Sequence, residues 1–319
     1  MKTRPFLALP GLALLCANAL AQYPARPVHI INPFAAGGSG DIVTRIVSQK
    51  ITENTGKTFV IESKTGAAGR IGYEAAVRSA PDGYTLALTD TTFTMMPALH
   101  GAMPWHTPEA LQPVTIIAQS PFLILVRPEL KIATLRDFIA HAKANPGKLN
   151  YGSAGMGSIN HITNELFKRE AGVDLVHVPY KGMTDAITGL LGGSLDMIMI
   201  GILPIAAHIA SGKAVPIAIA APQRSQGLPN LPTVDEAGLP GYRAGNWFGW
   251  TAPNGTPAEN MDWLQREIAR ALTAPDVRDR LVAQGVVPSG MPREEFRKIM
   301  RDDAQRWATI ISAAGIKTQ

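Results

Sequence analysis

Short apolar runs alternate with helix-like segments along almost the whole chain, and this alternation restricts the fold more than any other feature. The strand-like runs cover residues 28–31, 59–61, 85–89, 122–126, 149–152, 175–178, 196–200 and 215–220. Helical spacing of apolar residues marks residues 41–52, 72–79, 134–144, 159–171, 184–191 and 203–211. Repeated strand–helix–strand units are typical of a mostly parallel sheet with helices on its faces. The alternation occurs in two successive stretches, so we expect an α/β protein with two domains.

The C-terminal part of the chain is helical. Proline stands near the start of each of three predicted helices, at residues 256–272, 275–284 and 292–313. Proline is tolerated in the first turn of a helix but not in its interior, which predicts three separate helices. Their apolar faces indicate packing against a sheet.

The first 21 residues have the form of a secretory signal peptide. Lys2 and Arg4 precede an apolar stretch at residues 6–20, and Ala19-Leu20-Ala21 provides a small-x-small cleavage site. The stretch is short for a membrane span and is broken by Pro10. We therefore expect export to the periplasm, with Gln22 as the first residue of the mature chain.

Cysteine and charge restrict the function of the mature chain. Cys16 is the single cysteine and leaves with the signal peptide, so disulfides, thiolate metal sites and a cysteine nucleophile are excluded. Loss of Lys2 and Arg4 lowers the formal net charge of +5 by two. The remaining basic residues are dispersed and aromatic residues are sparse, so we expect no nucleic-acid binding.

Two glycine-rich turns each connect a strand-like run to a helix. The first, residues 32–41, reads NPFAAGGSGD, and the second, residues 152–158, reads GSAGMGS. A helix N-terminus presents unpaired N–H groups and a partial positive charge, and glycine lets an anion approach the backbone. Neither turn has the G-x-G-x-x-G spacing or the Lys-Ser/Thr pair of nucleotide sites. The pair of turns predicts a cleft whose two walls both suit an oxyanion.

Two residues of the first turn have more than one interpretation. Asp41 complements the dipole of the following helix, or it recognises an amine on the ligand. Ser39 caps the helix, or it donates a hydrogen bond to the ligand.

No catalytic or metal-binding constellation is apparent. His161 and Glu165 are four residues apart on one helix face, but no third ligand accompanies them. Ser153 and Ser158 are not in a Gly-x-Ser-x-Gly turn, and we interpret His177 as a structural histidine rather than a base. We therefore expect a protein that is not an enzyme and that has no metal and no cofactor.

Several ordered motifs resemble one family. They are Tyr23-Pro24-x-x-Pro27, Asn32-Pro33-Phe34-Ala35-Ala36-Gly37-Gly38-Ser39, Ala80-Pro81-Asp82-Gly83-Tyr84, Asn145-Pro146-Gly147-Lys148-Leu149-Asn150-Tyr151-Gly152-Ser153, His177-Val178-Pro179-Tyr180-Lys181-Gly182 and Pro232-Thr233-Val234-x-Glu236-Ala237-Gly238. Together they span the mature chain, which resembles the Bug receptors, the TctC-type periplasmic substrate-binding proteins of tripartite tricarboxylate transporters.

The resemblance implies a type II periplasmic binding protein, a Venus-flytrap of two α/β domains with a central cleft. The expected division is a signal peptide at 1–21, one domain from 22–122 plus 247–319, and a second from 123–246. In this family both strand-to-helix turns hold a small carboxylate, largely through backbone N–H groups and small hydroxyls. Carried over by position, the implied ligand-binding residues are Phe34, Ala36, Gly37, Gly38, Ser39, Asp41, Thr89, Ser153, Gly155, Gly157, Ser158, Tyr180 and Gly201.

The resemblance also implies partners. They are a small carboxylate and separate membrane subunits of a transporter, with a monomeric receptor. A membrane sensor kinase is the alternative partner, in which case the protein senses a ligand rather than delivering it.

This sequence departs from the family pattern in two segments. The first turn has Ala35 and Gly40, where family members often have Pro and Thr. The segment after the third strand reads TDTTFTMMPALH, so we expect Asp90, Phe93 and Met95 to alter the pocket. Near the expected return between domains, Asn246-Trp247-Phe248 contributes either an aromatic wall or packing at the hinge.

Overall fold

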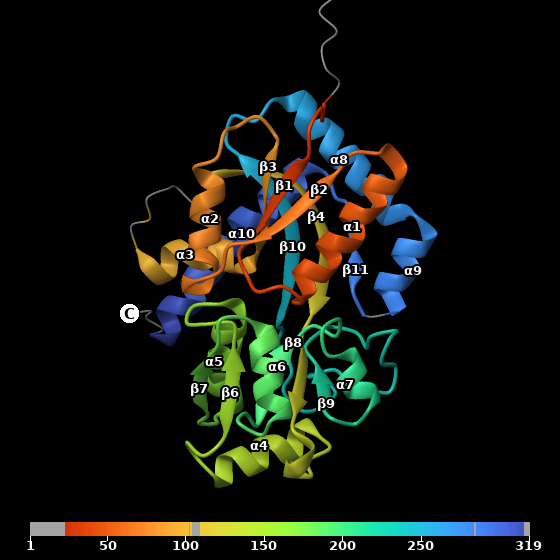
Figure 1. Cartoon of the computed structure of the whole chain (residues 1–319). Helices are drawn as coiled ribbons and strands as arrows, with labels where there is room; N and C mark the ends of the chain where they lie inside the picture. Colours follow the sequence, from red (N-terminus) through yellow and green to blue (C-terminus); the bar gives the residue numbers. More distant parts are fainter. Residues whose placement is uncertain (1–22, 102, 104–108, 284, 316–319) are drawn as a thin grey trace, which may run out of the picture.

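Two β-sheets organise the chain, and their strands follow the predicted α/β alternation (Figure 1). The structure is a computed structural model that describes residues 23–101, 103, 109–283 and 285–315, so the expected signal peptide lies outside the described part. The first sheet has the order β11-β4-β10-β3-β1-β2 and the second has the order β7-β6-β8-β5-β9. The first contains β1 (Val28–Asn32), β2 (Phe59–Ser63), β3 (Thr85–Asp90), β4 (Leu111–Pro121), β10 (Gly245–Pro253) and β11 (Val287–Pro288). The second contains β5 (Leu123–Val126), β6 (Asn150–Ser153), β7 (Val176–Pro179), β8 (Met197–Ile200) and β9 (Val215–Ile219).

Helices cover both faces of each sheet, as the buried apolar residues demonstrate. On the first sheet, α1 (Ser39–Thr55), α8 (Ala258–Thr273) and α9 (Pro275–Ala283) share one core, while α2 (Arg70–Val77), α3 (Thr91–His100) and α10 (Arg293–Ala314) share the other. On the second, α4 (Leu135–Ala144) and α5 (Ile159–Ala171) pack on one face, and α6 (Met183–Leu191) packs on the other beside the short α7 (Ala206–Ala210). The parallel pairs β1–β2, β1–β3, β6–β7 and β6–β8 carry the strand–helix–strand units.

Two chain segments join the sheets at one place. The chain leaves the first sheet between β4 and β5, and it returns at the start of β10. Phe122, Ala220 and Ala244 meet there: Phe122 N donates to Ala244 O, Ala220 N to Phe122 O, and Ala244 N to Ala220 O. The connection between the sheets is therefore a narrow backbone-bonded junction.

Two helices that pack on the first sheet, α3 and α10, also contribute side chains to the apolar core of the second sheet. Met95 and Leu99 of α3, with Trp307 and Ile311 of α10, join the apolar residues around α5. The end of α10 thus packs against both sheets.

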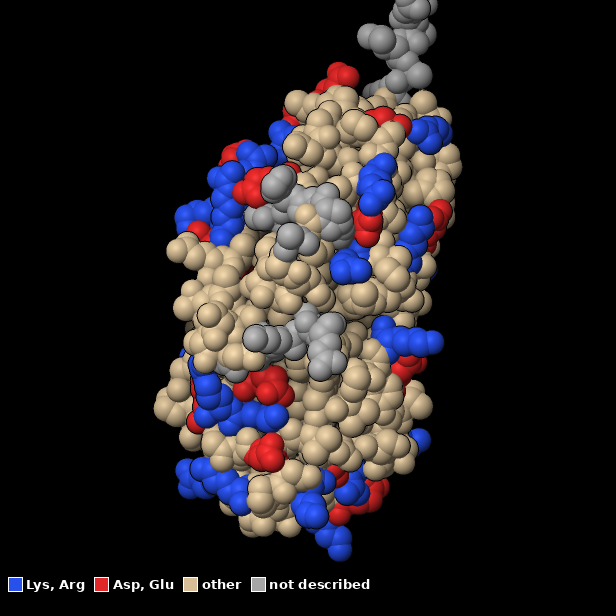
Figure 2. All heavy atoms as spheres, turned by 90° about the vertical axis from the view of Figure 1, so that its left-hand side faces the viewer, with Lys and Arg blue, Asp and Glu red and all other residues tan. Residues whose placement is uncertain are grey.

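Charged residues are mixed on the surface. On the face in Figure 2, Lys and Arg are interspersed with Asp and Glu, and no extended patch of one sign is visible. Within the described ranges no helix combines the length and the apolar character that a membrane crossing requires.

Candidate functional site

The first glycine-rich turn connects β1 to α1, and side chains within the turn fix its shape. Asn32 Oδ1 accepts from Phe34 N at 3.0 Å, and Asn32 Nδ2 donates to Asp41 Oδ1 at 3.2 Å. Asp41 Oδ2 accepts from Gly37 N and from Arg45 Nε, both at 2.9 Å. Gly37 has a φ of +84°, a backbone conformation that favours glycine. Asp41 is therefore occupied by the turn itself and by its ion pair with Arg45.

The N-terminus of α1 leaves several backbone donors without a helical partner. The first bond of the helix runs from Ile42 N to Gly38 O, and the cap residue Gly38 has no side chain to satisfy earlier N–H groups. A Cβ on Gly40 would lie 2.8 Å from the Phe248 ring, so only glycine fits where this aromatic ring packs on the helix end. The helix end thus presents free N–H groups beside an aromatic ring.

The end of β3 places a second acid near the first turn. Asp90 caps α3 and accepts from Thr92 N at 2.9 Å and from Tyr73 Oη at 2.7 Å. Asn246 Nδ2 donates to its other oxygen at 2.8 Å, while Asn246 Oδ1 accepts from Thr91 N. Burial raises the pKa of the Asp90 carboxyl above its usual range, and these hydrogen bonds oppose that effect.

The second glycine-rich turn, between β6 and α5, is held by two stacked histidines. Ser153 Oγ lies 2.6 Å from His177 Nε2, and Gly157 N donates to His161 Nδ1 at 3.0 Å. The His161 and His177 rings stack with centroids 4.2 Å apart. Burial, followed by the proximity of His161, lowers the pKa of His177 to about 4, and burial also lowers the pKa of His161. Both rings are therefore neutral at pH 7 and serve the shape of the turn.

The elements around the two sheets touch each other across the gap between the sheets. Thr184 Oγ1, on α6, donates to Ala36 O at 3.0 Å, and Ile159 N, at the start of α5, donates to Thr92 Oγ1 at 3.2 Å. A Cβ on Gly182 would lie 2.8 Å from the Ala35 Cβ. Elements packed on the first sheet therefore contact elements packed on the second sheet across the cleft.

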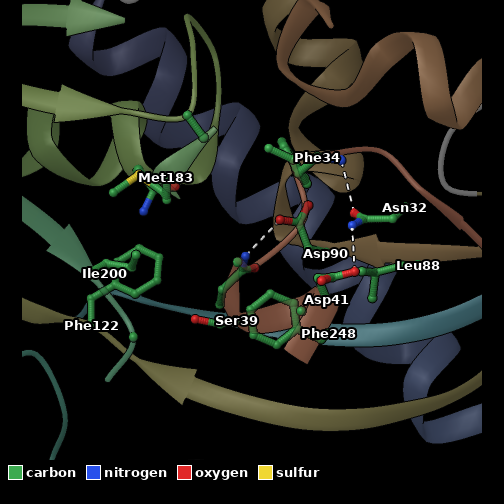
Figure 3. Close-up of a pocket in the computed structure, with 17 residues that line it drawn as sticks. Asn32, Phe34, Ser39, Asp41, Leu88, Asp90, Phe122, Met183, Ile200 and Phe248 are labelled. Atoms are coloured by element: carbon green, nitrogen blue, oxygen red, sulfur yellow. Dashed lines mark hydrogen bonds between the residues drawn. The ribbon is translucent and has the colours of Figure 1, made fainter. Parts of the chain in front are cut away.

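A cavity of about 70 Å³ remains between them, at the N-terminus of α1 (Figure 3). Residues from both sheets line it: Asn32, Phe34, Ala35, Gly38, Ser39, Gly40, Asp41, Leu88, Asp90, Phe122, Ala154, Asn160, Met183, Ile200, Gly201, Asn246 and Phe248. In Figure 3 the polar side chains of the first sheet face Phe122, Met183 and Ile200 from the second.

Five residues of the predicted site line this cavity, namely Phe34, Gly38, Ser39, Asp41 and Gly201. Ala36 and Gly37 lie in the first turn against Thr184. Ser153, Gly155, Gly157 and Ser158 build the second turn behind the cavity wall, to which their neighbour Ala154 contributes.

Two further predicted residues point elsewhere. Thr89 is buried in the first sheet, where its Oγ1 donates to Gly249 O at 3.2 Å. The ring of Tyr180 packs on Gly189 of α6 and not on the cavity.

Residues from distant parts of the sequence complete the lining. Of the three residues expected to alter the pocket, Asp90 reaches it, whereas Phe93 and Met95 are buried in the cores around α3. Phe248 and Asn246 line the cavity, but the Trp247 indole packs on α10 and donates to Asp303 Oδ2 at 2.6 Å. Register pairs Phe248 with Asp90 across β10 and β3, a relationship that sequence position alone does not reveal.

Comparison with known proteins places these features in a wider context. The profile of the family described as "Tripartite tricarboxylate transporter family receptor" matches residues 43–316. Protein BugT of Bordetella pertussis is 33% identical, over 99% of this chain and 99% of that protein. Among solved structures, an R. palustris protein with adipate has 29% identity and a TM-score of 0.89, covering 93% of this chain and 100% of that chain. MatC of Rhodopseudomonas palustris with bound malate has 30% identity and a TM-score of 0.85, covering 91% and 100%.

Proposed function

Because the chain belongs to the family of tripartite tricarboxylate transporter receptors, we propose that it captures a small carboxylate in the cleft and delivers it to separate membrane subunits. The observation that carries this proposal is the cavity at the N-terminus of α1, bordered by residues that belong to both sheets and their connections. The helix end offers unpaired N–H groups and a partial positive charge to an oxyanion.

The ligands of related proteins support a carboxylate. Two related proteins, each matched over its whole length by this chain, were solved with adipate and with malate. The Ser39 hydroxyl and the first turn of α1 border the cavity, so one carboxylate can accept hydrogen bonds from both.

Capture would occur by closure of two bodies around the ligand. We take these bodies to be residues 22–122 with 247–319, and residues 123–246. The separation of the strands into two sheets supports two bodies, and β10 of the first sheet begins at Gly245, close to the second boundary. The junction at Phe122, Ala220 and Ala244 is narrow enough to act as a hinge. The bonds from Thr184 to Ala36 and from Ile159 to Thr92 would then form only in the closed state.

The proposed role is binding and release without chemistry. Ser153 and His177 are hydrogen bonded, but both lie behind the cavity wall, where the pair stabilises the second turn. The same role accords with export to the periplasm after removal of residues 1–21.

The test is titration of the mature protein with a panel of small carboxylates, followed by recovery of the ligand. We expect one bound carboxylate per chain, recovered chemically unchanged, together with a smaller radius of gyration in solution scattering. Chemical conversion of the ligand, or absence of binding across the panel, would refute the proposal. N-terminal sequencing of protein from a periplasmic extract tests the cleavage at residue 21.

A further inference from the structure

The charges that line the cavity are unbalanced. Asp41 and Asp90 both border it, and no Lys, Arg or His is among the described residues that do. The charge of Asp41 is compensated by Arg45, which pairs with it at 2.9 Å. Asp90 receives only neutral donors, and no ion pair to it is present in the described ranges.

Asp90, which lines the cavity, retains an unfilled acceptor position. Its Oδ1 accepts from Tyr73 and Thr92, and its Oδ2 accepts from Asn246. A carboxylate has about four acceptor positions, so one on Oδ2 is unfilled. Figure 3 displays Asp90 at the border of the cavity, beside the helix end that carries Ser39.

The rest of the described lining is mostly apolar and contains no cationic side chain for a second anionic group. Leu88, Phe122, Met183, Ile200 and Phe248 are apolar. The three asparagines of the lining each already donate one hydrogen bond from the side-chain amide, Asn32 to Asp41, Asn160 to Met199 O and Asn246 to Asp90. A dicarboxylate would therefore bring its second charge close to Asp90 or against apolar side chains, at a cost in desolvation and repulsion.

We propose that the natural ligand is an amino carboxylate, with its carboxylate at the N-terminus of α1 and its ammonium group at Asp90. This inference rests on the proposed function, and it names the ligand class within that function. The ammonium group would supply the cation that the buried Asp90 lacks, and a buried carboxylate is much more stable with a hydrogen-bonded cation than without one. The apolar wall would contact the carbon chain between the two groups.

Two sets of matched ligands test the proposal by isothermal titration at pH 7. Each set shares one carboxylate and its carbon chain, and only the far end changes from ammonium to methyl to carboxylate. The sets are 3-aminopropanoate, butanoate and succinate, and 5-aminopentanoate, hexanoate and adipate; 2-aminohexanoate tests an ammonium group next to the carboxylate. A hydrogen bond to a charged group corresponds to about 1.5–3 kcal/mol, so we expect an ammonium ligand to bind about 10- to 150-fold tighter than its methyl counterpart.

An exchange of side chains tests the role of Asp90. In Asp90→Asn the new amide can still accept from Tyr73 and Thr92, but its NH₂ faces the NH₂ of Asn246. The double variant Asp90→Asn with Asn246→Asp restores a donor–acceptor pair, so its thermal stability reports whether the site is folded. Asp90→Asn should reduce the ratio of ammonium to methyl affinity by at least tenfold, whereas the exchange variant is used for stability alone, because its acid at position 246 also borders the cavity. Asp303→Asn is the control, because Asp303 is another acid with restricted solvent exposure but accepts from Trp247 outside the cavity.

The outcomes separate the two proposals. Tighter binding of the methyl or carboxylate ligand than of every ammonium ligand refutes the amino-carboxylate inference and leaves carboxylate capture standing. An ammonium preference that survives in folded Asp90→Asn refutes the role of Asp90. If none of these ligands and no other carboxylate in the panel binds, both proposals fail.

Discussion

Asn32 and Asp41 lie on opposite sides of the turn between β1 and α1, and Asn32 Nδ2 donates to Asp41 Oδ1 at 3.2 Å. The same Asp41 accepts from Gly37 N and pairs with Arg45. The sequence allows two interpretations of Asp41: it complements the dipole of α1, or it recognises an amine on the ligand. The hydrogen bonds favour a third role, in which the carboxylate fixes the turn that holds the ligand.

Replacement of Asp41 tests this positioning role. Asp41→Ala leaves Gly37 N and the Asn32 amide without an acceptor in a buried place, so we expect a loss of about 2–3 kcal/mol in the free energy of unfolding. Urea denaturation measures this loss of stability. In titrations, the affinities for all carboxylates should decrease by a similar factor. Asp279→Ala is the control, because its pair with Arg278 is at the surface and such pairs add little. A selective loss of ammonium ligands in Asp41→Ala, with full stability, would contradict the positioning role.

Gly37→Asp tests whether the first turn contacts the ligand. The substitution adds negative charge and backbone strain at a φ of +84°, and we expect at least a hundredfold loss of carboxylate affinity in a folded protein. Gly56→Asp is the matched control, since Gly56 ends the same helix at a φ of +69° with an open surrounding. Equal affinities in the two variants would remove the first turn from the binding site.

A bond across the cleft provides a test of closure. Thr184→Val removes the donor to Ala36 O, which should shift the equilibrium toward the open form and weaken binding about two- to fivefold. Thr188→Val, one turn further along the exposed side of α6, removes a bond to Thr184 O within the helix only. Titration and solution scattering should detect a change in the first variant alone; identical behaviour of both variants would argue against a closed ligand-bound state.

The alternation of strands and helices was predictable because each βαβ unit depends on local pattern. The predicted strand at residues 28–31 is β1, and the predicted helix at residues 159–171 is α5 with the same ends. The elements that the sequence did not predict are those whose structure depends on contacts with distant segments of the chain. β10 is buried along nearly its whole length between β3 and β4, so its sequence GNWFGWTAP has no polar–apolar alternation to detect.

The helix α3 escaped prediction for a different reason. It contains Pro97 and three threonines, and both residue types are unfavourable in a helix interior. Its stability comes from the Asp90 cap and from packing against α10. For the binding site the same limit applies: the glycine-rich turns were recognisable locally, whereas the proximity of Asp90, Phe248 and Ile200 depends on strand pairing and on closure of the two halves.

Stability should depend on pH through the stacked histidines. His177 has a pKa of about 4 in the folded protein, below the value near 6.5 of a free histidine. As the pH falls from about 6.5 to 4, the unfolded chain therefore binds a proton that the folded chain does not, and stability decreases across this window. His161, whose pKa is also lowered, acts in the same direction.

Urea denaturation between pH 7.5 and 4 measures this effect. We expect a decrease of about 1–2 kcal/mol from His177, less than the full shift implies because the side chain is partly exposed to solvent. His177→Gln should have a shallower pH dependence, whereas His141→Gln, on the exposed side of α4, should follow the wild type. A parallel decrease in all three proteins would assign the effect to other groups.

The central claim is that a small carboxylate is captured at the N-terminus of α1 and is released unchanged. Its most direct test is isothermal titration of the mature wild-type protein and of Gly37→Asp with the same panel of carboxylates. The account predicts saturable binding of one ligand per chain to the wild type and none to the folded variant at the same concentrations. Binding that persists unchanged in Gly37→Asp, or no binding by the wild type, would contradict it.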